Sequence, residues 1–117
     1  MIDIEYQSDA FRKECENKAK MLKKRGEKRA KLIQQRLSEL RAANCLEDIR
    51  HLPGPRLHQH TRKHGQKKAI FSVDLDHPYR LFFTASADPE PSLPGGGVDW
   101  KLVTAVLIIG IEDPHGN

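Results

Sequence analysis

The sequence predicts one α+β domain, in which an N-terminal helical hairpin packs on one face of a small, mainly antiparallel twisted sheet. Helical periodicity dominates residues 8–43, strand-like runs dominate residues 56–115, and a turn rich in Pro and Gly separates them. A strand, two helices and then several strands are typical of helices that cover one sheet face, which leaves the other face for a ligand. A length of 117 residues allows one modest core without metal or disulfide support.

The chain begins with a short strand at residues 1–7. Ile2, Ile4 and Tyr6 alternate with polar residues there, which is the pattern of a half-buried strand. Ser8 follows directly, and its side chain is well suited to cap the N-terminus of a helix. The first helix is therefore expected to begin just after this strand.

Residues 8–43 predict a helical hairpin with its turn at Gly26. The apolar stripes are Phe11, Cys15, Ala19 and Leu22 in the first helix, and Ala30, Ile33, Leu37 and Leu40 in the second. Between residues 12 and 36 the helices carry eleven Lys and Arg against three Glu. Such a surface is either a solvated helix face or a positive wall that attracts RNA or an acidic antagonist, and the sequence leaves both open.

The C-terminal half predicts several short strands. A helical turn at 46–49 and a stop at residues 52–55 precede it. The strands are expected at 56–61, 69–75, 79–85 and 102–111, with an exposed loop at 86–98 that is rich in Pro and Gly. The last strand is almost entirely apolar, which predicts a central strand buried on both faces.

Composition restricts the class of protein. The net charge of +4 and a pI near 9.2 favour an anionic partner. Cys15 and Cys45 lack the spacing of a zinc site or of a disulfide framework, so reduced thiols are expected. No apolar stretch reaches the roughly 18–20 residues that span a bilayer. We therefore expect a cytoplasmic protein without membrane association.

A cationic tract lies between residues 50 and 68, which contain six Lys or Arg, four His and no Asp or Glu. Such a stretch beside a β-hairpin is suited to a nucleic-acid backbone. The alternative is a solvated turn. The residues expected to bind nucleic acid are Arg56, His60, Arg62, Lys63, Lys67 and Lys68.

Arg56, His58 and His60 alternate, so in a strand their side chains would share one face about 7 Å apart. With His64, the two histidines could supply three ligands to a metal ion. The tract has no acidic or Cys ligand, however, and its positive charge repels a cation. We therefore predict neither a metal nor a cofactor.

Two further groups are candidates for chemistry. Arg80 interrupts an apolar strand and could stabilise negative charge on a phosphate, unless it pairs with Asp74 or Asp76 across the hairpin. Asp113 and His115 lie two residues apart, so a carboxylate and an imidazole could act as base and acid at one phosphate. The alternative for His115 is a surface residue at a frayed terminus.

The order and spacing of several short motifs over residues 32–116 resemble the RelE/ParE superfamily of bacterial toxins, and most closely its HigB-like branch of plasmid maintenance killer proteins. The motifs are Leu37-x-x-Leu40-x-Ala42-Ala43, Leu46-Glu47-Asp48, Leu52-Pro53-Gly54-x-Arg56-Leu57-His58, Ser72-Val73-Asp74-Leu75-Asp76-His77-Pro78-Tyr79-Arg80-Leu81-Phe82-Phe83, Val103-Thr104-Ala105-Val106 and Ile111-Glu112-Asp113-x-His115-Gly116. Residues before 32 fit by helical pattern only.

The resemblance implies the toxin of a type II toxin–antitoxin system. Such toxins enter the ribosomal A site and cleave mRNA without a metal, and a cognate antitoxin, often a helix-turn-helix protein, holds them inactive. By this resemblance Arg80 would stabilise the transition-state charge, and His58 and His115 would transfer protons or align the substrate. Asp113 would orient an imidazole or the attacking hydroxyl.

The chain departs from the HigB-like pattern at three places. Pro114 replaces a common Tyr, Asp74 stands where a second Arg is frequent, and the turn at residues 61–65 replaces a Lys-Gly turn. Two other classes therefore stay open: a degenerate member that binds RNA or antitoxin without catalysis, and a ParE-like inhibitor of DNA gyrase. A generic RNA-binding module is disfavoured, because the few aromatic residues are expected in the core.

Overall fold

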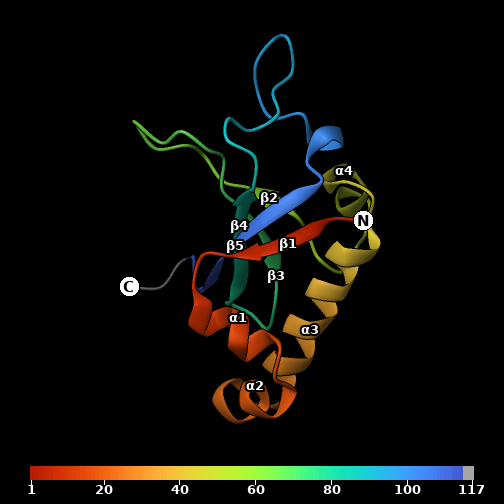
Figure 1. Cartoon of the computed structure of the whole chain (residues 1–117), viewed down its shortest axis with the longest axis vertical. Coiled ribbons are helices and arrows are strands. Elements are labelled where there is room, and N and C mark those ends of the chain that lie inside the picture. The colour runs from red at the N-terminus through yellow and green to blue at the C-terminus, as the bar shows by residue number, and fades with distance from the viewer. Residues whose placement is uncertain (115–117) are drawn as a thin grey trace.

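The computed structural model describes residues 1–114, which form a five-stranded mixed sheet with four α-helices (Figure 1). The α+β class is therefore confirmed. In chain order the elements are β1 (Asp3–Tyr6), α1 (Asp9–Cys15), α2 (Lys18–Arg25), α3 (Glu27–Ala42), α4 (Leu46–Arg50), β2 (His58–Gln59), β3 (Phe71–Asp74), β4 (Arg80–Ala85), the 3-10 turn η1 (Trp100–Leu102) and β5 (Ala105–Glu112).

The strand order is β1-β5-β4-β3-β2, so the last strand of the chain lies inside the sheet. β5 pairs parallel with β1 and antiparallel with β4, and the β4–β3 and β3–β2 pairings are also antiparallel. The prediction of a mainly antiparallel sheet is confirmed. The register of β4 against β5 shifts between Phe82 and Phe83, whose partners are Gly110 and Ile108, so the extra residue of this bulge is Ile109 of β5.

The N-terminal helical region is broken into more pieces than predicted. Ser8 caps α1 by accepting a hydrogen bond from the Phe11 N–H, as expected. The helix then ends at residue 15, and Asn17 caps α2 by accepting a bond from the Lys20 N–H. The predicted stripe across residues 8–26 is therefore wrong in its second half, because the break rotates α2 and exposes Leu22 while burying Met21.

The second predicted helix is confirmed, and so is the turn before it. Gly26 has a φ of 83°, a left-handed conformation that glycine adopts without strain. The four predicted core residues of α3 (Ala30, Ile33, Leu37 and Leu40) are all buried. Burial of a Leu or Ile side chain stabilises a fold by about 1.5–3 kcal/mol, so this stripe fixes α3 on the sheet.

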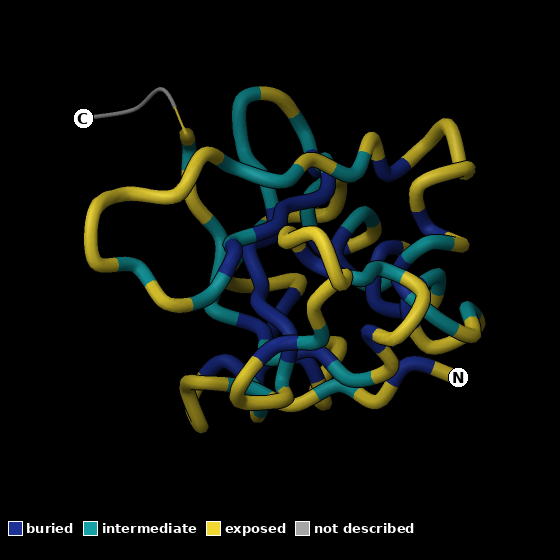
Figure 2. The backbone as a smooth tube through the Cα atoms, turned by 90° about the horizontal axis from the view of Figure 1, so that it is seen from above, coloured by how far each residue is buried: buried dark blue, intermediate teal, exposed yellow. Residues whose placement is uncertain are grey.

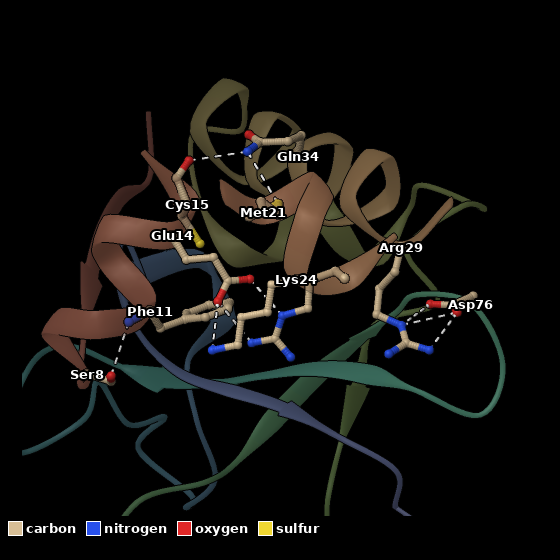
Figure 3. A network of polar contacts seen from close by, with 10 residues as sticks. Ser8, Phe11, Glu14, Cys15, Met21, Lys24, Arg29, Gln34 and Asp76 are labelled. Carbon is tan, nitrogen blue, oxygen red and sulfur yellow. Dashed lines mark hydrogen bonds and ion pairs between the residues drawn. The ribbon is translucent and has the colours of Figure 1, made fainter. Parts of the chain in front are cut away.

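A buried carboxylate joins the two short N-terminal helices (Figure 3). The Glu14 side chain at the end of α1 is 1% exposed, and it accepts two hydrogen bonds from Arg25, at 2.6 and 3.1 Å. Lys24 lies 3.5 Å from the same carboxylate. Burial alone would raise the pKa of Glu14, but the bonds and charges of Arg25 and Lys24 outweigh it and lower that pKa.

The helices pack on one face of the sheet and leave its other face uncovered by helix (Figure 3). In β5, Val106 and Ile108 are fully buried, whereas Leu107, Ile109 and Ile111 are only half-buried. The prediction of a strand buried on both faces is therefore wrong: a single helical layer covers one face only. Figure 2 shows the buried strands at the centre, with exposed loops around them.

Two loops project from the end of the sheet opposite α1 and α2 (Figure 1). The first loop spans residues 60–68. A strand was predicted over residues 56–61 before it, but only His58 and Gln59 pair with β3. Arg56 interrupts the extended backbone with a φ of 47°. The second, residues 86–98, is largely exposed as predicted, although Glu90 within it is buried.

Within residues 1–114 no helix is both long and apolar enough to cross a membrane.

Candidate nucleic-acid interface

A cleft of about 880 Å³ opens on the sheet face without helices and brings together several of the predicted site residues. Its apolar lining comes from the strands and includes Phe82 of β4 and Ile109 and Ile111 of β5. Its polar lining includes the predicted residues His58, His60, Lys63 and Asp113. A site with an apolar lining and convergent polar groups is suited to a base and its phosphate.

His58 and His60 form one wall of this cleft. Their ring centroids are 4.6 Å apart with an edge-to-face orientation, which confirms that the two imidazoles lie together. Antiparallel pairing fixes them, since His58 stands opposite Ser72 and the His60 N–H donates to the Ile70 carbonyl at 2.9 Å. Arg56 does not extend this row, because its backbone turns away and its guanidinium lies 3.5 Å from the Asp74 carboxylate.

His60 is the more enclosed of the two imidazoles. Its ring stacks on Phe82 at 5.1 Å between centroids, and its Nε2 lies 2.7 Å from the hydroxyl oxygen of Ser72. Burial lowers the pKa of His60, and the neighbouring His58 and Arg80 lower it further because a second positive charge is unfavourable there. The lowered pKa favours the neutral form of His60, whereas the His58 side chain is exposed at the rim.

Arg80 donates its hydrogen bonds to protein atoms. Its Nε donates to the Ser72 hydroxyl at 2.6 Å, its Nη1 pairs with the Asp74 carboxylate, and its Nη2 donates to the Arg56 carbonyl at 2.7 Å. The side chain is only 14% exposed, and burial lowers the pKa of Arg80 while the Asp74 charge opposes that shift. The cross-hairpin ion pair, one of the two alternatives for Arg80, is thus present.

The end of β5 supplies the opposite wall of the cleft. Glu112, Asp113 and Pro114 all line it, and Glu112 is paired with Arg80 in the β4–β5 register. The predicted Asp113 therefore shares a cleft with His58, across from the histidine wall. His115, the fourth residue predicted for catalysis, lies outside the described residues.

The basic residues predicted to bind nucleic acid divide between two places. Lys63 lines the cleft, but Arg62, Lys67 and Lys68 line a separate pocket of about 400 Å³. Arg62 forms an ion pair with the buried Glu90 there, and the Lys68 Nζ donates to the Ala85 carbonyl at 2.8 Å. The predicted cationic surface is therefore not continuous.

Sequence reasoning missed Glu90, Ser72 and Phe82. Glu90 accepts a hydrogen bond from the Ala69 N–H at 2.7 Å, so it fastens the 86–98 loop to the start of β3. The period of two along β3 and β4 was an available signal for the other two, because the core takes Phe71, Val73, Leu81 and Phe83. The sequence contains no comparable signal for Glu90, since an acidic residue between two prolines is expected to be exposed.

Among residues 1–114 no three His, Cys, Asp or Glu side chains cluster in a way that could hold a metal ion. The two cysteines are free thiols, Cys15 at the end of α1 and Cys45 at the N-cap of α4.

No protein-family model matches this chain, and no curated protein and no solved structure matches it either.

Proposed function

We propose that this chain is the toxin of a type II toxin–antitoxin system and acts as a metal-independent, ribosome-associated mRNA endoribonuclease. The observation that carries the proposal is the cleft in which His58, Lys63 and Asp113 surround an apolar surface. These are a proton carrier, a cation and a carboxylate, which suffice for transesterification of RNA. The motif resemblance to HigB-like toxins supplies the ribosome and the antitoxin as partners.

In the proposed reaction, the RNA 2′-hydroxyl attacks the adjacent phosphorus. The bond from phosphorus to the 2′-oxygen forms and the bond to the 5′-oxygen breaks, which gives a 2′,3′-cyclic phosphate and a new 5′-hydroxyl. A base takes the 2′-hydroxyl proton and an acid protonates the leaving oxygen. We assign the two proton transfers to His58 and Asp113, which line the same cleft, and charge neutralisation to Lys63.

The apolar surface supplies the binding part of the proposal. Stacking of a base on an aromatic ring contributes about 1–3 kcal/mol and tolerates any sequence. The half-buried His60 ring, which stacks on the buried Phe82, offers such a surface next to the isoleucines of β5. A single-stranded nucleotide is therefore a better match than a duplex, whose bases are already stacked.

The arrangement around Arg80 favours a second candidate, a superfamily member that binds RNA or its antitoxin without cutting. A guanidinium that already pairs with Asp74 and donates to Ser72 and the Arg56 carbonyl has little left to offer a phosphate. Pro114 adds to this, because it replaces the ring of a Tyr beside the C-terminal acid. A ParE-like gyrase inhibitor stays the third possibility.

The experiment is induction of the chain in a bacterial host, alone and together with the neighbouring gene if that gene encodes a small helix-turn-helix protein. We expect growth arrest and new mRNA 5′ ends with the chain alone, and rescue with the neighbour. His58→Ala should abolish both effects, and His51→Ala is the matched control because His51 is exposed at the C-cap of α4.

Three contrary results have separate meanings. Growth arrest with a DNA-damage response and no new RNA ends would identify a gyrase inhibitor. Binding of RNA without cutting or arrest would identify a degenerate member. Absence of arrest, cutting and binding would contradict the toxin assignment.

A further inference from the structure

Ser72 connects a fixed cation to an imidazole of the cleft. The side chain is fully buried on β3, with a relative exposure of 0%. Its hydroxyl oxygen lies 2.6 Å from Nε of Arg80 and 2.7 Å from Nε2 of His60. The three side chains come from β3, β4 and the residue just after β2, so the sheet register brings them together.

The donor and the acceptor in each of the two hydrogen bonds of the Ser72 hydroxyl follow from chemistry. An arginine Nε–H only donates, so the Ser72 oxygen accepts from Arg80. The hydroxyl has one proton of its own, and the short distance to His60 Nε2 gives that proton an acceptor. The proton of the neutral His60 ring then lies on Nδ1. The ion pair between Arg80 Nη1 and the Asp74 carboxylate fixes the guanidinium that donates to Ser72.

We infer that Ser72 is a positioning residue, which holds His60 as a neutral imidazole protonated on Nδ1, so that of the two described imidazoles in the cleft His58 is the one that transfers a proton. This inference deepens the proposed function. His60 would bind RNA by stacking and by donating a hydrogen bond, and it would not serve as a base while Nε2 accepts from Ser72.

The charges around His60 point in the same direction. Arg80 on β4 and Lys63 on the following loop are cationic, and His58 on β2 becomes cationic when it takes a proton. Asp113 and Glu112, at the end of β5, are the acidic residues that line the same cleft. Two imidazoles 4.6 Å apart do not both become charged readily. A neutral His60 therefore leaves the proton to His58.

Histidine-selective ¹⁵N NMR of the free protein tests this inference without any cleavage assay. We expect the wild-type His60 to show Nδ1–H with Nε2 unprotonated, and to become protonated only below the pH range of an ordinary histidine. Ser72→Ala should remove the Nδ1–H preference and raise the pH at which His60 takes a proton. Ser72→Thr keeps the hydroxyl and should restore the wild-type spectrum.

Two further variants keep the test decisive. If the buried Ser72→Ala protein fails to fold, Arg80→Lys takes its place in the test. This variant removes the planar donor to Ser72 and should weaken the Nδ1–H preference of His60. Ser92→Ala is the matched control, because that hydroxyl bonds within the 86–98 loop, and it should leave the His60 signals unchanged. A wild-type His60 protonated on Nε2, or a Ser72→Ala spectrum like the wild type, would overturn the inference.

Cleavage kinetics give the second readout. Ser72→Ala should change the dependence of the cleavage rate on pH, whereas a purely structural role would lower the rate equally at every pH. If the NMR result is as expected but the wild type cuts no RNA, the proposed function and the role of His58 fail, and the tautomer assignment stands.

Discussion

Asp74 and Arg80 stand opposite each other in the β3–β4 register and form an ion pair, and Arg80 also contacts Ser72, the partner of His60 in the cleft. Their side chains are 25% and 14% exposed, so the pair is partly shielded from water. The pair neutralises the guanidinium of Arg80, which is the one charged side chain of β4. Under the proposed function, Asp74 therefore limits the positive charge that RNA meets near Arg80.

Asp74→Asn should tighten RNA binding. Removal of one negative charge near the phosphate path is worth about 1 kcal/mol, or roughly fivefold in affinity. The measurement is fluorescence anisotropy of a 2′-O-methyl RNA oligonucleotide, which binds without being cut. Asp76→Asn is the control, because Asp76 pairs with Arg29 of α3. Equal affinities for the wild type and Asp74→Asn would contradict a role for this pair in RNA binding.

Lys63 and Lys67 should differ in their effect on RNA, although they lie in the same loop. Lys63 lines the cleft and Lys67 lines the separate pocket beside Glu90. Lys63→Ala is expected to weaken binding and to reduce the slope of log affinity against log salt by about 0.7, the value for one phosphate contact on a single strand. Lys67→Ala should leave the slope unchanged. A loss of the same size for both would mean that RNA follows the whole loop.

Glu14→Gln should destabilise the fold through the link between α1 and α2. The variant removes the charge that Arg25 and Lys24 face, at a carboxylate that is 1% exposed. Breaking a fully buried pair costs about 3–5 kcal/mol, and we expect about 2 kcal/mol here because Arg25 is partly exposed. Urea unfolding measures the change. Asp9→Asn, which removes an exposed pair, is the control.

The lowered pKa of Glu14 also determines how this residue makes stability depend on pH. Because the pKa of Glu14 is lowered in the fold, the unfolded chain binds more protons at acidic pH. Its contribution is therefore fully present above the ordinary value of 4.5 and is lost as the pH falls through the lowered folded value. Glu14→Gln should remove this part of the acid sensitivity, and an unchanged acid profile would contradict the assignment.

Cys15 should be unreactive in the folded protein. Burial, followed by the nearby charge of Glu14, raises the pKa of this thiol to about 11, so little thiolate exists at neutral pH. A thiol reagent at pH 7.5 should modify Cys45 first and Cys15 only after denaturation, as mass spectrometry of the digested protein would show. Rapid modification of Cys15 under native conditions would mean that α1 opens readily.

Most of the fold follows from local patterns. Alternation predicts β1 and the β3–β4 hairpin, and the stripe of α3 is buried as the period of 3.6 requires. The break at residues 16–17 was missed because the apolar spacing continues through it, while the Asn17 cap and the buried Glu14 decide the geometry. Such a charge pair depends on tertiary contacts that periodicity does not report.

Several residues of the site could be predicted from the sequence, but how they divide between the cleft and the separate pocket could not. One cleft contains His58, His60, Lys63 and Asp113. The sheet brings them together because β2 and the end of β5 both border the cleft on the face without helices. Arg62 and Lys68 belong instead to the fastening of the 86–98 loop, which depends on the buried Glu90. A basic tract in sequence does not reveal which of its cations already have partners.

The central claim is tested most directly with purified protein added to translating ribosomes on a reporter mRNA, followed by mapping of the RNA ends. We predict discrete cuts with 2′,3′-cyclic phosphate and 5′-hydroxyl ends from the wild type and from His51→Ala. His58→Ala should cut at least about 100-fold more slowly, which is the contribution of a positioned proton carrier. Intact mRNA with the wild-type protein, or equal cutting by His58→Ala, would contradict the account.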